Sequence, residues 1–361
     1  MTVEPIAALR DALLRRIDAH DVSIGIIGQG YVGLPLALTF VDKGFRVLGF
    51  DVDAEKVATL NRGECYIRHV DSVRVKRARE TTLFEATADF NRLHEPDAIL
   101  ICVPTPLTAQ KEPDLTYVRQ TAEAIRLRVR RGQLIVLEST TYPGTTDELV
   151  RGVLEQGGLT AGVDFFLAFS PEREDPGNKS HSTSTIPKVV GGIDVVSGDV
   201  AQRLYDAAVA KTVRVSSARA AEATKLTENI FRAVNIALVN ELKIVYDKMG
   251  IDIWEVLDAA STKPFGFMRF NPGPGWGGHC IPLDPFYLAW KAREYGVSTK
   301  FIELAGEINV RMSEYVVGKL QAALNEGGRA VKGAKVLVLG LAYKKDIDDP
   351  RESPEIGRAH V

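Results

Sequence analysis

The sequence predicts an α/β protein with an N-terminal doubly wound parallel sheet, a central all-α domain and the start of a truncated second α/β domain. Short apolar strands alternate with helical stretches over about the first 210 residues, which is typical of a parallel sheet covered by helices. A stretch without Gly or Pro then runs from Ala218 to Met249. The strand-then-glycine pattern returns at 335–340. These observations divide the chain into residues 1–212, 213–325 and 326–361.

The first predicted domain begins with a helix and then alternates strands with helices. Residues 2–20 have the spacing of an amphipathic helix that packs on this domain. The run VSIGIIG at 22–28 is apolar and ends in glycine, as a buried parallel strand does. A helix at 32–43, closed by Gly44, leads to a strand at 45–50. Further apolar strands are predicted at 98–103, 134–138, 165–169 and 188–190.

The middle of the chain is predicted to be helical throughout. The long stretch 218–249 predicts one helix, and a Gly/Pro-rich loop, NPGPGWGG, occupies 271–278. We expect the long helix to pack on another helix across the axis of a homodimer. Further helices are predicted at 252–260, 284–295 and 298–325.

The end of the chain predicts an incomplete domain. The run KVLVLG at 335–340 predicts the first strand of a second α/β domain, but about 20 residues follow it and a domain needs at least about 50. Residues 355–361, EIGRAHV, match an in-frame translation of a common sequencing adapter. We therefore expect that these last residues are not native and that this domain is truncated.

Composition narrows the class of protein. A net charge of -2 gives no support for nucleic acid or an anionic membrane as a partner. The three cysteines are too few and odd in number for a disulfide framework, which favours a reducing, cytoplasmic compartment. No apolar run reaches the roughly 18 residues that a membrane span requires. No His/Cys cluster has metal-ligand spacing, so no metal is expected.

A glycine motif predicts a dinucleotide site in a Rossmann-type domain. Gly28, Gly30 and Gly33 form GxGxxG, with Tyr31 and Val32 between the last two, directly after a predicted strand and at the start of a helix. The glycines permit a tight turn, close approach of a pyrophosphate and close helix–strand packing, and the helix N-terminus favours phosphate. Asp51, at the end of the next strand, suits ribose hydroxyls and repels a 2′-phosphate, so NAD is expected over NADP. Lys56 is a candidate for holding the ribose or pyrophosphate.

Two threonines follow predicted strands. Thr105 comes after the strand at 98–103, and Thr140 comes after the strand at 134–138. Ligands of open α/β sheets bind at the carboxyl ends of the strands. Both threonines are therefore placed to face a cofactor or substrate, although a threonine at a strand end also caps helices.

Five further residues are candidates for catalysis. Cys280 lies between the glycine loop and a predicted helix start, where a thiol has a lowered pKa. Asp284 follows four residues later. Lys225 and Asn229, four residues apart on the long helix, supply a cation and an amide donor for a developing alkoxide. Glu172, after the strand at 165–169, suits activation of water. Each residue type also has an ordinary structural interpretation, such as a buried cysteine or a solvated lysine.

These segments resemble the nucleotide-sugar dehydrogenase family that includes UDP-glucose and GDP-mannose dehydrogenases. The shared features extend from GQGYVGLP to GLAYKKDIDDPRESP, which is nearly the whole chain. The segments GWGGHCIPLDPFYLAWKA and KLTENIFRAVNIALVNEL are the most specific. The run PFGFMRFNPGPGWGGHCIPLDPFYL resembles most the branch that acts on UDP-N-acetylglucosamine or UDP-N-acetylmannosamine in surface-polysaccharide synthesis.

The resemblance implies a role for each candidate. Cys280 is the nucleophile, Lys225 and Asn229 stabilise the oxyanion and hold the sugar, and Asp284 works with water. Thr140 positions that water, and Glu172 takes part in thioester hydrolysis. The implied NAD contacts are Gly28, Gly30, Tyr31, Val32, Gly33, Asp51, Lys56, Thr105 and Thr140. The implied UDP-sugar contacts are Glu172, Lys225, Asn229, Gly277, Lys344 and Arg351.

The implied reaction oxidises the sugar C6 hydroxymethyl to a carboxylate in two hydride transfers, through a thiohemiacetal and a thioester on Cys280. Three alternatives remain at this point. The sugar could be UDP-glucose. The enzyme could be a 3-hydroxyacid dehydrogenase, which also pairs a lysine and an asparagine but stops after one hydride transfer. The chain could also be an inactive NAD-binding fragment that lacks the UDP domain.

Overall fold

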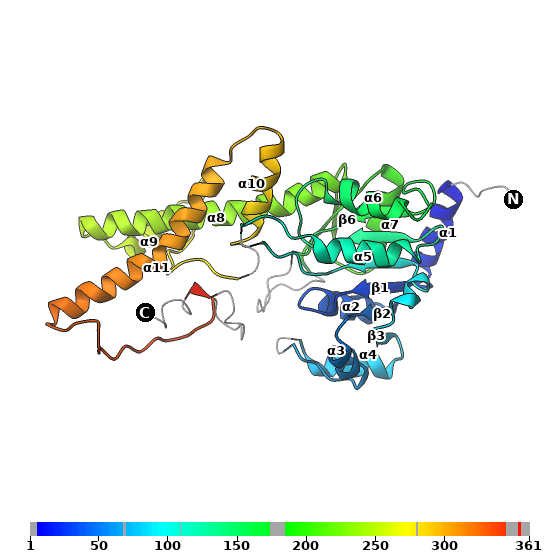
Figure 1. The fold of residues 1–361 in the computed structure, drawn as a ribbon, viewed down its shortest axis with the longest axis horizontal. Helices are drawn as coiled ribbons and strands as arrows, with labels where there is room; N and C mark the ends of the chain where they lie inside the picture. The colour runs from blue at the N-terminus through cyan, green and yellow to red at the C-terminus, as the bar shows by residue number, and fades with distance from the viewer. Residues whose placement is uncertain are drawn as a thin grey trace. The chain divides into compact units, whose positions relative to one another are not determined.

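The computed structural model describes residues 6–67, 70–108, 110–173, 185–278, 281–343 and 353–354. The chain divides into two compact units, Met1–Lys225 and Leu226–Val361. The division falls inside one unbroken helix, α8 (Ala218–Met249; Figure 1). The domain limits at residues 212 and 325 stay a prediction.

The first unit contains an eight-stranded sheet in the order β3-β2-β1-β4-β5-β6-β7-β8. The order reverses beside β1, and strands β1 to β6 are parallel, which confirms the doubly wound α/β class. Every strand predicted in this unit is present. The strands are β1 (Ser23–Ile27), β2 (Arg46–Phe50), β3 (Phe84–Thr87), β4 (Ala98–Ile101), β5 (Leu134–Leu137), β6 (Phe166–Phe169), β7 (Lys188–Gly192) and β8 (Thr212–Arg214).

Two features of this sheet differ from the prediction. Strand β7 is antiparallel to β6, with Phe169 opposite Gly191, whereas a parallel strand was expected at 188–190. An antiparallel neighbour needs no crossover helix, and the sequence between the two strands is rich in Ser, Thr and Pro rather than periodic in apolar residues. The edge strands β3 and β8 were not predicted, because they are short and carry charged residues.

Helices cover both faces of the sheet, so its central strands are apolar throughout. Residues Ile24 and Ile26 of β1 are fully buried against α1, α2 and α7, and Ile27 on the other face is also buried. The helices of this unit are α1 (Ile6–Asp18), α2 (Gly33–Asp42), α3 (Ala54–Asn61), α4 (Ser72–Glu80), α5 (Thr116–Arg126), α6 (Arg151–Glu155) and α7 (Val195–Asp206), with the short turns η1 (Phe90–His94) and η2 (Thr145–Val150).

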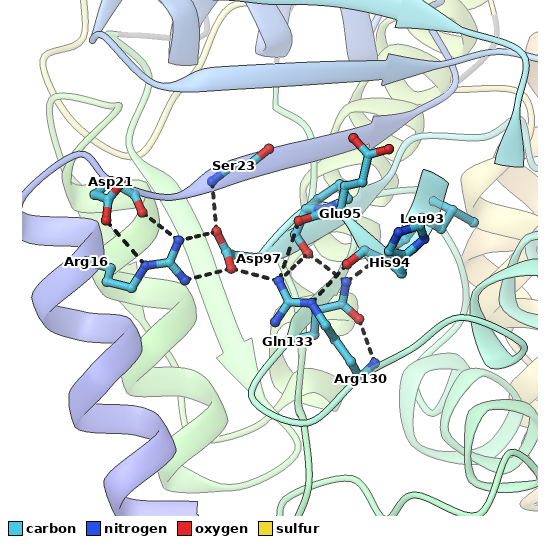
Figure 2. A network of polar contacts seen from close by, with 10 residues as sticks. Arg16, Asp21, Ser23, Leu93, His94, Glu95, Asp97, Arg130 and Gln133 are labelled. Atoms are coloured by element: carbon cyan, nitrogen blue, oxygen red, sulfur yellow. Dashed lines mark hydrogen bonds and ion pairs between the residues drawn. The ribbon is translucent and has the colours of Figure 1, made fainter. Parts of the chain in front are cut away.

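A buried carboxylate connects helix α1 to the amino ends of the parallel strands (Figure 2). Asp97, directly before β4, accepts hydrogen bonds from Arg16 at 2.7 and 2.8 Å, from Arg130 at 2.7 Å and from the Ser23 amide at 3.0 Å. Burial opposes ionisation of Asp97, but the two guanidinium groups and the amide prevail and lower its pKa. The apolar face of α1 also enters the core, which confirms that this helix packs on the first domain.

The second unit is helical, as predicted. Helix α8 continues into it, followed by α9 (Ile253–Ser261), α10 (Asp284–Glu294) and α11 (Lys300–Glu326). Asn240 of α8 and Asn309 of α11 are fully buried and share a 2.8 Å hydrogen bond. None of the helices among the described residues is long and apolar enough to cross a membrane.

The strand predicted at 335–340 does not form. These residues have no regular secondary structure, and Leu337 and Leu339 are 82% and 87% exposed. A strand needs neighbouring strands to bond its N–H and C=O groups, and the described residues after α11 include none. An apolar sequence pattern alone therefore does not produce a strand here.

Candidate functional site

The glycine turn after β1 is shaped by packing at two of its glycines and by open space at the third. Gly28 has φ of +92°, and a Cβ there would lie 2.5 Å from the Cys102 carbonyl oxygen. A Cβ on Gly33 would lie 1.8 Å from the carbonyl oxygen of Gly28. No atom lies within 4 Å of a Cβ built on Gly30. The turn thus leaves its open side at Gly30, where a pyrophosphate has room to approach the backbone.

Helix α2 begins at this turn without a side-chain cap. Its N-cap residue, Val32, makes no side-chain hydrogen bond to the helix, and the neighbouring Tyr31 side chain is partly exposed. The first N–H groups of a helix carry partial positive charge. This helix start is therefore suited to bind phosphate oxygens.

Asp51 lies beside the glycine turn at the end of β2. Its buried carboxylate accepts hydrogen bonds from the amides of Gln29 at 2.9 Å and Asp53 at 3.0 Å. The ammonium nitrogen of Lys56 lies 4.0 Å from the same carboxylate. These contacts fix an acceptor next to the turn, in the position that a ribose hydroxyl requires.

Tyr66 is a further neighbour of this turn. Its hydroxyl donates a hydrogen bond to the Gln29 carbonyl oxygen, and Lys56 Nζ lies 5.9 Å from the centre of its ring. Burial, reinforced by the nearby Asp51 carboxylate, raises the pKa of Tyr66, so its hydroxyl remains a donor. No local pattern could have identified Tyr66, because it lies in an irregular segment between α3 and α4.

The two predicted threonines lie close together at the carboxyl ends of strands β4 and β5. Thr105, after β4, donates a 2.7 Å hydrogen bond from its hydroxyl to the carbonyl oxygen of Thr140, after β5. Both residues are half-buried. The structure thus brings together two strand ends that the sequence identified separately.

Glu172 and Lys225 also meet within the first unit. Both residues are 9% exposed. Lys225 Nζ donates a 2.5 Å hydrogen bond to the backbone carbonyl oxygen of Glu172, and Glu172 Oε1 accepts one from the Arg173 amide at 2.7 Å. The Lys225 ammonium group is therefore held by the segment that follows β6.

Glu222, one turn before Lys225 on α8, is a further site residue that no sequence motif identifies. Its carboxylate accepts hydrogen bonds from the Gly144 amide at 2.6 Å and from the Thr146 amide and hydroxyl at 2.9 and 2.7 Å. Burial, only partly offset by these donors, raises its pKa to about 7. Glu222 thus connects α8 to the segment that follows Thr140.

Asn229 and Asp284 pair within the second unit. Asn229 Nδ2 donates a hydrogen bond to Asp284 Oδ2, and both side chains are buried. Asp284 is the first residue of α10, so this pair connects α8 to the start of that helix. Gly277 lies half-buried in the preceding loop.

Part of the predicted site lies outside the described residues. These residues are Cys280, Lys344, Arg351 and 355–361. Of the remaining predicted residues, Thr105, Thr140, Glu172 and Lys225 belong to the first unit, and Asn229, Gly277 and Asp284 belong to the second. Among the described residues, no group of three or more His, Cys, Asp or Glu side chains is arranged to hold a metal ion.

Comparison with known proteins accounts for most of the chain. Residues 22–209 match the model for the NAD binding domain of the UDP-glucose/GDP-mannose dehydrogenase family, and residues 219–311 match the model for its central domain. The open glycine turn, the uncapped helix start and Asp51 fit this cofactor. The predicted cofactor, NAD, is thereby confirmed.

Individual relatives agree with these matches. A UDP-N-acetyl-D-glucosamine 6-dehydrogenase of Pseudomonas aeruginosa is 40% identical over 335 residues, which cover 92% of this chain and 78% of that protein. A UDP-N-acetyl-D-mannosamine dehydrogenase of Pyrococcus horikoshii is 35% identical over 335 residues, with coverage of 92% and 79%.

Solved structures extend the agreement to the fold. The structure of the Pyrococcus horikoshii UDP-D-ManNAc dehydrogenase superposes with a TM-score of 0.88 at 34% identity, covering 94% of this chain and 80% of that one. An NDP-N-acetyl-D-galactosaminuronic acid dehydrogenase from Methanosarcina mazei gives a TM-score of 0.81 at 32% identity, covering 97% and 78%. The family resemblance seen in the sequence is confirmed: this chain belongs to the UDP-glucose/GDP-mannose dehydrogenase family.

Proposed function

We propose that this protein oxidises the C6 hydroxymethyl group of UDP-N-acetylglucosamine or UDP-N-acetylmannosamine to a carboxylate, for surface-polysaccharide synthesis. The observation that carries the choice of sugar is the 40% identity, over 92% of the chain, to a UDP-N-acetyl-D-glucosamine 6-dehydrogenase. The balanced reaction consumes one alcohol, two NAD⁺ and one water, and yields the carboxylate, two NADH and three protons. NAD, held by the glycine turn and Asp51, would supply the hydride acceptor for each of the two oxidations.

The residues of the chain have distinct roles in this proposal. The Cys280 thiolate attacks the aldehyde carbon to give a thiohemiacetal, whose oxidation gives a thioester. The Lys225 ammonium group and the Asn229 amide stabilise the oxyanions that form at C6. Asp284 orients the Asn229 amide through their hydrogen bond and works with the reacting water. Lys225 is already oriented by the Glu172 carbonyl oxygen.

Hydrolysis of the thioester requires a group that takes a proton from water. We assign this role to the Glu172 carboxylate, with Thr140 positioning the water. The attacking water loses a proton to Glu172, its oxygen bonds to the acyl carbon, and the C–S bond breaks to release the Cys280 thiolate. A buried carboxylate that is held at a strand end suits a general base.

The test compares NADH formed per sugar consumed for the wild type, C280S and C65S on a panel of UDP-sugars and GDP-mannose. The wild type should give two NADH per N-acetylated UDP-sugar, and C280S should lose nearly all turnover. C65S is the matched control, because Cys65 is a free thiol that lies outside the proposed machinery, and it should behave as the wild type. Two NADH per sugar at an unchanged rate in C280S would exclude covalent catalysis, and a preference for UDP-glucose would exclude the proposed sugars.

We also propose that the protein is a homodimer formed through α8. Four large apolar side chains, Phe231, Leu238, Val245 and Met249, are 46%, 54%, 43% and 63% exposed. Their spacings of seven, seven and four residues place them along one face of the helix. An exposed apolar stripe of this length favours pairing with a second helix.

Sedimentation of L238K tests this interface. The variant should shift the protein from dimer to monomer, since it places a charge in the middle of the stripe. The matched control is L127K, which changes a leucine of similar exposure in the first unit and should remain dimeric. A dimeric L238K would contradict the proposal.

The remaining assignments extend the same proposal. Lys344 and Arg351 are assigned to the UDP moiety, which residues 326–361 would begin to bind. Calorimetry with UDP tests this assignment, and K344A should weaken any binding that is found.

We propose a cytoplasmic location, because the two described free thiols favour a reducing compartment. Cell fractionation tests this location, and recovery from an oxidising compartment would contradict it.

A further inference from the structure

A buried polar cluster lies at the end of the sheet where the parallel strands finish. The proposed function assigns no catalytic or binding role to this cluster. Lys188, the first residue of β7, donates a 2.6 Å hydrogen bond to Glu138 Oε2, and the Tyr205 hydroxyl donates one to Glu138 Oε1. The three residues are 4%, 1% and 0% exposed. Lys188 Nζ also lies 5.0 Å from the centre of the Tyr205 ring. The cluster therefore fixes the Lys188 ammonium group from two sides.

The same ammonium group reaches the segment that carries Glu172. Lys188 Nζ donates a 3.3 Å hydrogen bond to the Pro171 carbonyl oxygen and lies 3.9 Å from Glu172 Oε2. The antiparallel arrangement of β7 explains this approach, because it brings the beginning of β7 to the edge where β6 ends. Continued beyond the paired residues, the register of Phe169 opposite Gly191 would place Glu172 opposite Lys188.

The charge on Lys188 is maintained by its neighbours. Burial alone lowers the pKa of Lys188, but the carboxylates of Glu138 and Glu172 outweigh burial and raise it. A buried ion pair adds little to stability compared with well-packed apolar side chains of similar volume. Stability therefore does not by itself account for a lysine that is shared between two carboxylates.

We propose that Lys188, anchored by Glu138 and Tyr205, is a positioning residue that holds the Glu172 carboxylate for hydrolysis of the thioester. This inference rests on the proposed function, because it deepens the role assigned to Glu172. Lys188 touches no reacting atom in this scheme. It fixes the backbone before Glu172 and attracts one carboxylate oxygen, so that the carboxylate is ready to take a proton from the attacking water.

The variants K188M and K188R distinguish the effect of the positive charge of Lys188 from the effect of its side-chain shape. K188M keeps an unbranched side chain of similar length without the ammonium group, and K188R keeps a cation. The readouts are kcat, the NAD dissociation constant, and the fraction of enzyme that carries an acyl group on Cys280, measured by mass spectrometry after acid quench of steady-state turnover with UDP-N-acetylglucosamine or whichever panel sugar is oxidised.

K188M should lower kcat about 10- to 100-fold, because a mispositioned base loses much of its contribution. Its NAD affinity should stay within about twofold of the wild type, since the glycine turn is untouched. The acyl-enzyme should become the main steady-state species, because the oxidations proceed and hydrolysis is slowed. K188R should restore a substantial part of kcat, which a role in core packing alone would not predict.

The outcomes distinguish failure of this inference from failure of the proposed function. If K188M turns over at the wild-type rate, or loses kcat without accumulating the acyl-enzyme, this inference is wrong and the proposed function is unaffected. If K188M fails to fold, E138M/K188M removes both charges with little change in volume and should fold and accumulate the thioester; wild-type turnover in it overturns the inference. If neither the wild type nor E172Q, in which hydrolysis should be blocked, forms an acyl-enzyme with any sugar, the proposed function is wrong and this inference fails with it.

Discussion

Replacing Glu222 with glutamine should change how stability depends on pH. Glu222 is buried at the start of α8 and its pKa is raised to about 7 from an ordinary value of 4.5. A carboxyl group with a raised pKa binds its proton more tightly in the folded state than in the unfolded state. Its stabilising contribution is therefore complete below pH 4.5 and is lost as the pH rises through 7.

The size of the effect follows from the two pKa values. Each tenfold difference in proton affinity corresponds to about 1.4 kcal/mol, so the full loss is about 3 kcal/mol. About 2 to 3 kcal/mol of it falls between pH 5 and pH 8. E222Q does not titrate in this range, so its free energy of unfolding should rise by this amount relative to the wild type as the pH increases.

The assay is thermal unfolding of the wild type and E222Q at several values between pH 5 and pH 8, followed by far-ultraviolet circular dichroism. Tryptophan fluorescence is unsuitable, because all three tryptophans lie in the second unit. E148Q, which changes an exposed carboxylate of the neighbouring segment, is the control and should follow the wild type. Parallel curves for the wild type and E222Q would refute the reasoning.

Three further predictions follow from the first unit. G33A should abolish measurable NAD binding in calorimetry, because its Cβ would lie 1.8 Å from a backbone oxygen of the turn; unchanged affinity would contradict this geometry. D51N should weaken NAD binding about tenfold or more, since a ribose acceptor is lost, and equal affinity would argue against the role of Asp51. D97N should lower the free energy of unfolding by about 1–3 kcal/mol at pH 7. Because the pKa of Asp97 is lowered, its contribution is present above 3.8 and is lost as the pH falls below that value, so this difference should shrink in acid; a pH-independent difference would refute the ionic explanation.

The parts of the fold that could be predicted are those specified by local sequence. Helix α8 could be located because 32 residues lack Gly and Pro, and β1 because a buried parallel strand is a continuous apolar run that ends in glycine. Strand β8 could not be located, since an edge strand of three residues has no local signature. The strand expected at 335–340 shows the converse, because its local pattern is strong but strand partners are absent among the described residues.

The candidate site divides in the same way. Its motif residues could be identified because their chemistry is tied to fixed spacings, as for the three glycines. Glu222, Tyr66 and Lys188 could not, since each is an ordinary residue type whose partners are distant in sequence: Lys188 and Glu138 are 50 residues apart. The role of Cys280 stays a prediction.

Gly30 is the one glycine of its motif where folding imposes no steric demand for the absence of a side chain. Its neighbours in the motif are fixed by the protein's own backbone, whereas at Gly30 the requirement comes from the molecule that docks there. A small side chain at this position would yield a correctly folded subunit that cannot bind NAD. Such a subunit, mixed with normal copies, would show whether the two active centres of the proposed dimer turn over independently.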